Sequence, residues 1–130
     1  MREILFRGKR ADNGEWVYGY FYEDIGSFIK ERASSVSTNT HLVDPSTVGQ
    51  YTGLTGKNGN RIFEGDILLP SKGSLRIHLL VVFLDFSWQM VLPSQKYYRH
   101  RLEVKDNGIY EVIGNIHENP ELLGEVSDNG

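Results

Sequence analysis

Residues 44–69 constrain the fold more than any other part of the chain, because they place five glycines and an Asn-Gly pair ahead of an apolar run. Glycine accepts left-handed backbone conformations that other residues resist, so a stretch this rich in glycine fixes tight turns. The stretch contains no pattern typical of a reaction centre. Its residues therefore predict a defined backbone path and assign no chemistry.

Asn-Gly pairs at residues 13–14, 58–59 and 107–108 lie between strand-like runs. This dipeptide is typical of the type I′ turns that join antiparallel strands. We therefore predict one hairpin between residues 3–9 and 15–22, and another between residues 101–105 and 109–114. The pair at 58–59 is predicted to lead into a strand over residues 61–69.

Two further segments have strand patterns with apolar residues on both faces. In residues 15–22, one face carries an aromatic row whose members are Trp16, Tyr18, Tyr20 and Tyr22. Such a row is typical of a core or a subunit interface, so we expect both faces to be covered. Residues 76–86 become apolar on both faces from residue 79, as a central strand does, so Leu79, Val81 and Phe83 are predicted to be buried. After a turn near residues 85–87, residues 86–92 predict the next strand.

Helical signals are short. Residues 119–124 predict one turn, with Asn119 as the N-cap and Gly124 as the stop, and residues 44–47 predict a second. Residues 31–40 are rich in Ser and Thr and are interpreted as a mobile loop. The fold class is thus mainly β: a strongly bent sheet or small partial barrel with hairpins and one or two short helices.

Length and composition indicate one globular domain over residues 1–124, with a frayed tail over residues 125–130. The 130 residues include no cysteine, which excludes disulfides, thiolate metal sites and a cysteine nucleophile. No apolar run is long enough to cross a membrane, and we see no leader peptide, so no membrane partner is expected. The net charge of −3 argues against a protein that coats nucleic acid through charge alone.

The side chains offer few reaction centres. On a strand, Glu64 and Asp66 would share one face, a spacing usable for a metal or for acid–base work. The competing interpretation is that Gly65 marks a bulge and the acids flank a strand. The histidines form no metal-binding pattern; they are His41, His78, His100 and His117. No metal site or cofactor is predicted, and catalytic residues stay unassigned.

The best binding candidate is the basic and aromatic segment at residues 96–101. Its candidate nucleic-acid-binding residues are Lys96, Tyr97, Tyr98, Arg99 and Arg101. Basic side chains can neutralise phosphates while aromatic rings stack on bases. The alternative is that the tyrosines help to close a small core while the charges face water.

Five motifs together resemble the YopX family of phage and prophage proteins. They are REILFRGK at residues 2–9, WVYGY at 16–20, VDPSTVGQYTGL at 43–54, KNG followed by IFEGDI at 57–67, and VIGNIHENPELL at 112–123. They span nearly the whole chain, and the stretches between them match less. Their shared residues are mostly glycines, aromatics and turn formers, which indicates maintenance of the fold.

The resemblance implies a small, mostly β protein encoded by bacterial mobile elements and acting in the bacterial cytoplasm. It implies no activity, and no catalytic residue can be transferred. We expect a non-enzymatic accessory protein that binds a host or phage protein and forms a homo-oligomer. Two alternatives stay open: a nucleic-acid-binding module using residues 96–101, and a small metal-dependent hydrolase using Glu64 and Asp66.

The turn at residues 58–59 gives a first testable prediction. Gly59→Val is expected to lower the free energy of unfolding by about 1 kcal/mol or more, because a β-branched residue resists positive φ. Chemical denaturation measures this change. A denaturation midpoint equal to that of the wild type would contradict the turn.

Overall fold

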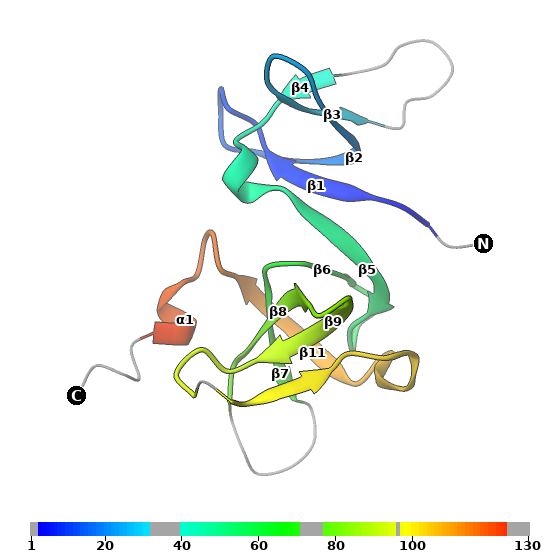
Figure 1. Cartoon of the computed structure of the whole chain (residues 1–130), viewed down its shortest axis with the longest axis vertical. Coiled ribbons are helices and arrows are strands. Elements are labelled where there is room, and N and C mark those ends of the chain that lie inside the picture. Colours follow the sequence, from blue (N-terminus) through cyan, green and yellow to red (C-terminus); the bar gives the residue numbers. More distant parts are fainter. Residues whose placement is uncertain (1–2, 32–39, 71–76, 96, 125–130) are drawn as a thin grey trace. The chain divides into compact units, whose positions relative to one another are not determined.

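The computed structural model describes residues 3–31, 40–70, 77–95 and 97–124. These residues form strands, two 3-10 turns and one short helix, and the chain groups into two compact units, Met1–Gly53 and Leu54–Gly130 (Figure 1). The predicted mainly β class is confirmed, in the form of two antiparallel sheets. The predicted tail, Lys96 and residues 32–39 of the predicted loop lie outside the described residues. The interpretation of residues 1–124 as one domain stays a prediction.

The first unit contains an antiparallel sheet in which four consecutive strands form a meander and the fifth returns to pair with the first. Its elements are β1 (Phe6–Lys9), β2 (Trp16–Glu23), β3 (Ser27–Glu31), β4 (Thr40–Leu42), the 3-10 turn η1 (Pro45–Thr47) and β5 (Gly49–Thr55). The sheet order is β4-β3-β2-β1-β5, and β6 (Arg61–Phe63) follows β5 as the sixth strand. Asp44 caps η1 by accepting a hydrogen bond from the Ser46 backbone N–H, which confirms the helical turn predicted there.

The first predicted hairpin is confirmed, since β1 and β2 pair in antiparallel register with Lys9 opposite Trp16. Its turn is longer than the predicted two-residue turn. The Arg10 N–H donates to the Glu15 carbonyl at 2.9 Å, which leaves a four-residue loop, and Gly14 closes the loop with a φ of 74°. The Asn-Gly pair therefore marks the end of this loop and does not form all of it.

The two faces of β2 differ more than the sequence predicted. Val17 is buried with Ile29 and Val43, and this cluster forms the core of the first unit. The tyrosines of the opposite face remain about half exposed, at 45% for Tyr18 and 50% for Tyr20. The expectation that both faces are covered is therefore wrong, because the buried core of the first unit lies on the Val17 face, whereas the face with the tyrosines keeps much of its surface exposed.

The second unit contains a five-stranded antiparallel sheet in the order β10-β9-β8-β7-β11. Its strands are β7 (Asp66–Pro70), β8 (Leu79–Leu84), β9 (Ser87–Val91), β10 (Arg99–Arg101) and β11 (Tyr110–Asn115). The 3-10 turn η2 (Val104–Asp106) precedes β11, and the single-turn helix α1 (Glu121–Gly124) follows it. None of the described helices is long and apolar enough to cross a membrane.

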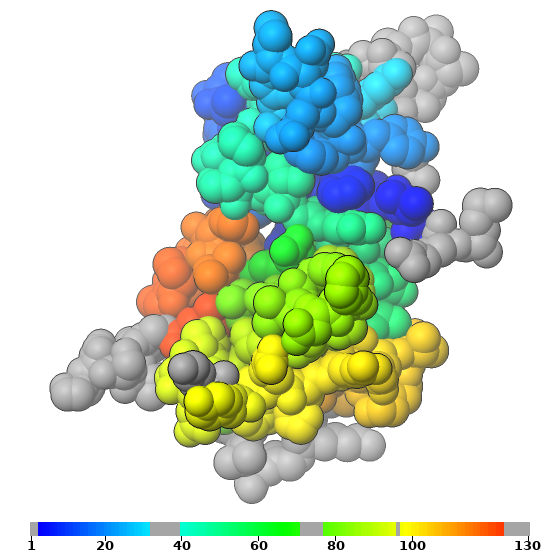
Figure 2. Space-filling model, viewed as in Figure 1, coloured from blue at the N-terminus to red at the C-terminus, as the bar shows by residue number. Residues whose placement is uncertain are grey.

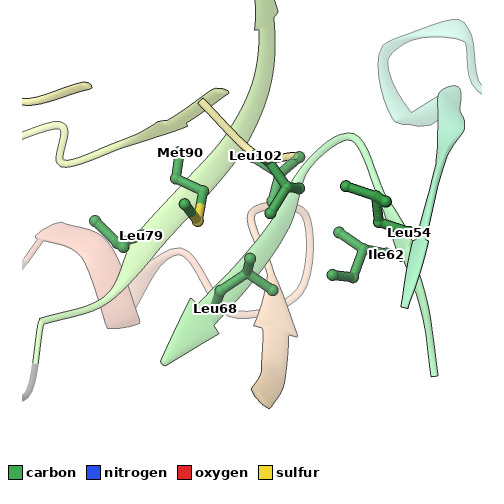
Figure 3. Close-up of a cluster of buried hydrophobic side chains, with 7 residues drawn as sticks. Leu54, Ile62, Leu68, Leu79, Met90 and Leu102 are labelled. Atoms are coloured by element: carbon green, nitrogen blue, oxygen red, sulfur yellow. The ribbon is translucent and has the colours of Figure 1, made fainter. Parts of the chain in front are cut away.

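Apolar side chains from several strands form the core of the second unit. Figure 3 shows these side chains gathered together, and each is at most 7% exposed. The cluster consists of Leu54, Ile62, Leu68, Leu79, Val81, Met90 and Leu102. The predicted burial of Leu79 and Val81 is thus confirmed.

Phe83 is 49% exposed, so its predicted burial is wrong. The strand β8 is internal to the sheet, as predicted, but β7 pairs only with Leu79 and Leu80. The end of β8 therefore extends beyond β7 and pairs with β9 alone. The Phe83 ring rests edge-on against the Trp88 ring, with 5.0 Å between the centroids, outside the core cluster.

The predicted hairpin between residues 101–105 and 109–114 is wrong, because β10 pairs with β9 and β11 pairs with β7. Side-chain hydrogen bonds hold the intervening residues in a different form. Asp106 accepts from the Glu103 N–H at 2.8 Å and thereby caps η2, while Asn107 accepts from the Thr55 N–H at 2.9 Å. Polar side chains here compete successfully with a hairpin ladder.

Two turn predictions concern residues 58–69. The turn at residues 58–59 is confirmed by a φ of 82° at Gly59. The strand predicted over residues 61–69 is two strands, β6 and β7, separated by a turn at Glu64 and Gly65. Gly65 has a φ of 93°, so its conformational freedom makes this turn possible.

The helical turn predicted over residues 119–124 is confirmed as α1, but Asn119 does not act as a side-chain cap for it. The Asn119 Oδ1 accepts from the Asn115 N–H at 3.1 Å. Its backbone carbonyl accepts from the Leu122 N–H at 3.0 Å. The side chain therefore fixes the bend that follows β11.

The difference between Leu79 and Phe83 predicts opposite responses to truncation. Leu79→Ala is expected to cost about 2 to 5 kcal/mol of unfolding free energy, because it opens a cavity in the core. Phe83→Ala is expected to cost about 1 kcal/mol, because most of what it loses is one edge contact between rings. Urea denaturation of both variants measures these costs, and a larger loss for Phe83→Ala would contradict the packing described here.

Candidate functional site

The segment predicted to bind nucleic acid lies at one edge of the second unit's sheet. Arg99 and Arg101 belong to the edge strand β10, and Tyr97, which precedes it, is 86% exposed. The Tyr98 ring packs edge-on against the His100 ring, with 4.9 Å between the centroids. The tyrosines therefore differ: Tyr97 faces water, whereas Tyr98 packs against the core cluster, as the alternative interpretation expected for both.

Both arginines of β10 form weak ion pairs. The Arg99 Nη1 lies 3.4 Å from the Asp85 Oδ2, and the Arg101 Nη1 lies 3.9 Å from the Glu103 Oε2. The Arg99 side chain is 47% exposed and that of Arg101 is 71% exposed. Ion pairs at such distances in water contribute little to stability, so both guanidinium groups remain accessible to an incoming anion.

Glu64 and Asp66 do not share one face of a strand, which corrects the geometry expected for a hydrolase. Glu64 lies in the turn after β6, and Asp66, which is 2% exposed, begins β7. The Asp66 Oδ2 accepts a hydrogen bond from the Phe63 N–H at 2.7 Å, across the turn. The buried carboxylate thus holds the turn between two strands.

The described histidines lie in separate places. The His41 Nε2 is 2.8 Å from the Glu31 Oε2, and the His78 Nδ1 is 2.8 Å from the Leu122 carbonyl. Within the described ranges, no group of three or more His, Asp or Glu side chains can hold a metal ion. Each of these two histidines has its hydrogen-bond partner within the same unit.

A shallow pocket of about 380 Å³ lies in the first unit between the β1–β2 loop and β4. Its polar lining includes Arg10 and Asp12, which form a bidentate pair with distances of 2.9 and 2.7 Å. The hydrogen bond to Asp12 raises the pKa of Arg10, and the same bond lowers the pKa of Asp12. The two opposite charges thus satisfy each other on the surface of the pocket.

The aromatic face of β2 combines a cation-contacting tryptophan with tyrosines that are about half exposed. The Trp16 ring has the Arg7 guanidinium carbon 4.6 Å from its centroid and the Lys9 Nζ at 5.6 Å. The Tyr22 ring stacks on the Phe28 ring, with 5.4 Å between the centroids. These contacts hold the ends of the face, and Tyr18 and Tyr20 between them are about half exposed.

The sequence interpretation missed the most exposed aromatic residue, at the tip of the hairpin formed by β8 and β9. Leu84 pairs with Ser87, so only Asp85 and Phe86 form the turn. Both adopt positive φ angles, of 51° and 62°, as a type I′ turn requires. Phe86 is 96% exposed, and Phe83 and Leu84 are also exposed. We call Phe83, Leu84 and Phe86 the apolar tip.

The sequence indicates a turn at this position, but the second turn residue, Phe86, is not typical of such turns. A turn was predicted near residues 85–87, and aspartate tolerates the left-handed conformation. Phenylalanine does not favour that conformation, so Phe86 was assigned to the following strand. The structure corrects this assignment, since β9 begins at Ser87.

A pocket of about 250 Å³ lies between the apolar tip and β10. Its lining residues are Leu84, Val91, Leu92, Pro93, Gln95, Tyr98 and Arg99. In Figure 2, the lime-green atoms of the β8–β9 hairpin and the yellow atoms of the β10 segment lie next to each other on the visible surface. The tip, the pocket and β10 together form the candidate binding surface.

Burial raises the pKa of the Tyr110 phenol, and the Asp106 carboxylate raises it further. The folded protein therefore holds the phenol in its neutral form. The resulting contribution to stability is present below the ordinary pKa of 10.0 and is lost as the pH rises through the higher folded value. Tyr110 packs against the core cluster, so the shift of its pKa is a consequence of packing and does not indicate a functional site.

The assignment of Asp66 to the turn gives a stability prediction. Asp66→Ala is expected to lower the free energy of unfolding by about 2 kcal/mol, because it removes the acceptor for the Phe63 N–H in a buried turn. Asp66→Asn retains an oxygen acceptor and is the matched control, with a smaller expected loss. Chemical denaturation tests both variants, and a wild-type midpoint for Asp66→Ala would exclude this role.

Comparison with known proteins gives the chain a family and a fold. None of the curated proteins matches the chain. A solved structure described as "Crystal structure of protein EF1440 from Enterococcus faecalis" is similar, with a TM-score of 0.63 and 23% identity. The similarity covers 95% of this chain and 99% of that chain, and it supports the fold alone. The profile of the family described as YopX protein matches residues 5–124, and the chain therefore belongs to the YopX family.

Proposed function

We propose that this protein is a phage- or prophage-encoded accessory module that acts in the bacterial cytoplasm by binding a partner protein, without an enzymatic reaction of its own. Membership of the YopX family supports the mobile-element origin. The exposure and backbone conformation of the apolar tip support the binding role.

Phe86 is the observation that carries the proposal. A left-handed conformation costs a residue with a Cβ about 1 to 2 kcal/mol relative to the usual backbone regions. At 96% exposure, the ring regains almost none of this cost by packing within the chain. Strained residues of this kind cluster at ligand-binding sites, where the binding partner supplies the missing contacts.

The surroundings of Phe86 suit a protein partner. Phe83 is held against Trp88 but is still 49% exposed, and Leu84 is 40% exposed, so the end of the hairpin presents apolar side chains besides the ring of Phe86. Exposed aromatic clusters mark interaction sites, and buried aromatic anchors supply much of the binding energy in protein interfaces. The two-residue turn presents the ring in one backbone conformation, which lowers the entropy lost on binding.

The tyrosine face of β2 favours a second contact, between copies of this chain. Tyr18, Tyr20 and Tyr22 are each more than 40% exposed and share one face. Tyrosine is enriched at interfaces because its ring covers area while its hydroxyl still finds hydrogen-bond partners. The proposed homo-oligomer is tested by light scattering at micromolar concentrations, and a monomer mass throughout would exclude it.

Replacing Phe86 by glycine should separate stability from binding. Phe86→Gly is expected to retain or raise the unfolding midpoint, because glycine accepts the positive φ without strain. The same variant is expected to lose the partner protein in affinity capture from lysogenic or infected bacterial lysate. The readout is the partner's yield relative to wild type, with the thermal midpoint measured on the same preparation.

Ile25 provides the matched control, since it is 98% exposed and lies in the other unit. Ile25→Ser is expected to recover the partner at the wild-type yield. Undiminished capture by Phe86→Gly would refute the role of the tip. Loss of the captured protein after nuclease treatment would instead favour nucleic acid as the direct ligand.

A further inference from the structure

We propose that the outer edge of β10 binds an extended, acidic segment of the partner protein as an added antiparallel strand. This inference rests on the proposed binding function and specifies the chemistry of the partner. It depends on three properties of the edge: its open backbone groups, its two arginines and the pocket beside it.

Among the described residues, the backbone of β10 is engaged on one side only, by β9. In an antiparallel pair, alternate residues direct their N–H and C=O groups toward the neighbouring strand. The Leu102 N–H donates to the Trp88 carbonyl at 2.9 Å, so Leu102 faces β9 and Arg101 faces away. The same alternation directs the N–H and C=O groups of Arg99 away from β9. These outward groups can pair with an added strand.

The other edge of the same sheet is already engaged. On β11, the Tyr110 carbonyl accepts the Lys57 N–H at 2.7 Å, outside the pairing with β7. A register shift between Val112 and Gly114 interrupts the ladder. Such a bulge makes an edge strand less able to pair with an added strand. In contrast, the β10–β9 register is continuous from Arg99 to Arg101. The open edge of this sheet is therefore β10.

The positive charges of β10 determine which kind of segment can pair with this edge. Arg99 and Arg101 are two residues apart, so their exposed side chains project on the same face of the sheet. Acidic residues opposite them would form cross-strand pairs of opposite charge. A second copy of β10 would instead place arginine and histidine against the same residues, and like charges in that position repel. The edge therefore favours an acidic partner over a second copy of this chain.

The pocket beside Arg99 offers an apolar contact on the adjoining sheet face, between β10 and the apolar tip. Its lining includes Leu92, Pro93 and Tyr98, which lie before β10 in the sequence. An aliphatic side chain two residues beyond the position opposite Arg99 would lie nearest to this pocket. The preferred segment thus carries two acidic residues and then an aliphatic residue, all at alternate positions.

A synthetic peptide of this pattern tests the inference directly. The probe is the end-capped peptide Thr-Glu-Thr-Glu-Thr-Leu-Thr, and the readouts are isothermal titration at low salt and amide hydrogen exchange. Binding is expected to slow exchange at the Arg99 and Arg101 amides of the wild-type protein. A peptide with Lys in place of Glu should bind at least about tenfold more weakly, as should a peptide N-methylated on the edge that faces β10.

Two variants of Arg101 separate charge from backbone. Arg101→Ala removes the charge and keeps the N–H, whereas Arg101→Pro removes both, and proline is tolerated on an outward-facing edge position. Arg101→Ala is expected to weaken peptide binding about tenfold, and Arg101→Pro to weaken it about tenfold more. If Arg101→Pro does not fold, the exchange experiment on the wild-type protein decides the question alone.

Three outcomes would overturn the inference. They are the absence of peptide binding at millimolar concentration, peptide binding without protection of the two amides, and binding of single-stranded oligothymidine in place of the peptide. Capture from lysate distinguishes this failure from that of the proposed function. A partner lost by Phe86→Gly but retained by Arg101→Pro would leave the apolar tip as the binding site and remove β10 from it.

Discussion

The backbone of Gly65 joins parts of the second unit that are far apart in sequence. Its N–H donates to the Val81 carbonyl on β8, and its carbonyl accepts from the Ile116 N–H after β11. The hydrogen bond from the Phe63 N–H to Asp66 holds the same turn closed. At this turn the chain leaves the strand order of the first sheet and enters that of the second. The positive φ of Gly65 permits this change of direction, so the five-stranded sheet depends on it.

Elements specified by local chemistry could be predicted from the sequence. The turn at residues 58–59, the cap of η1 by Asp44 and the single turn of α1 follow from residues within a few positions. The second predicted hairpin failed because Asp106 and Asn107 bind nearby or distant backbone N–H groups. The predicted burial of Phe83 was wrong because burial at that position depends on how far the neighbouring strand β7 extends. The sequence of β8 gives no information on the length of β7.

The sequence likewise predicts one part of the candidate site and not the other. Residues 96–101 combine basic and aromatic side chains, a pattern typical of binding segments, and the structure places the end of this segment on an edge strand. The apolar tip could not be predicted, because Phe83 and Leu84 continue an apolar strand pattern and Phe86 fits the strand that follows the predicted turn. Its exposure arises from two backbone angles at Asp85 and Phe86, and sequence pattern does not reveal a phenylalanine held against its preference.

The conformation of Phe86 has a consequence for the descent of this family. Many substitutions at this position, above all to glycine or asparagine, would relax the turn, so random drift alone would remove the phenylalanine over time. The proposed binding role therefore predicts that selection retains the ring. A lineage whose partner has disappeared is expected to lose the aromatic side chain early, while the glycine at position 65 persists for as long as the protein folds.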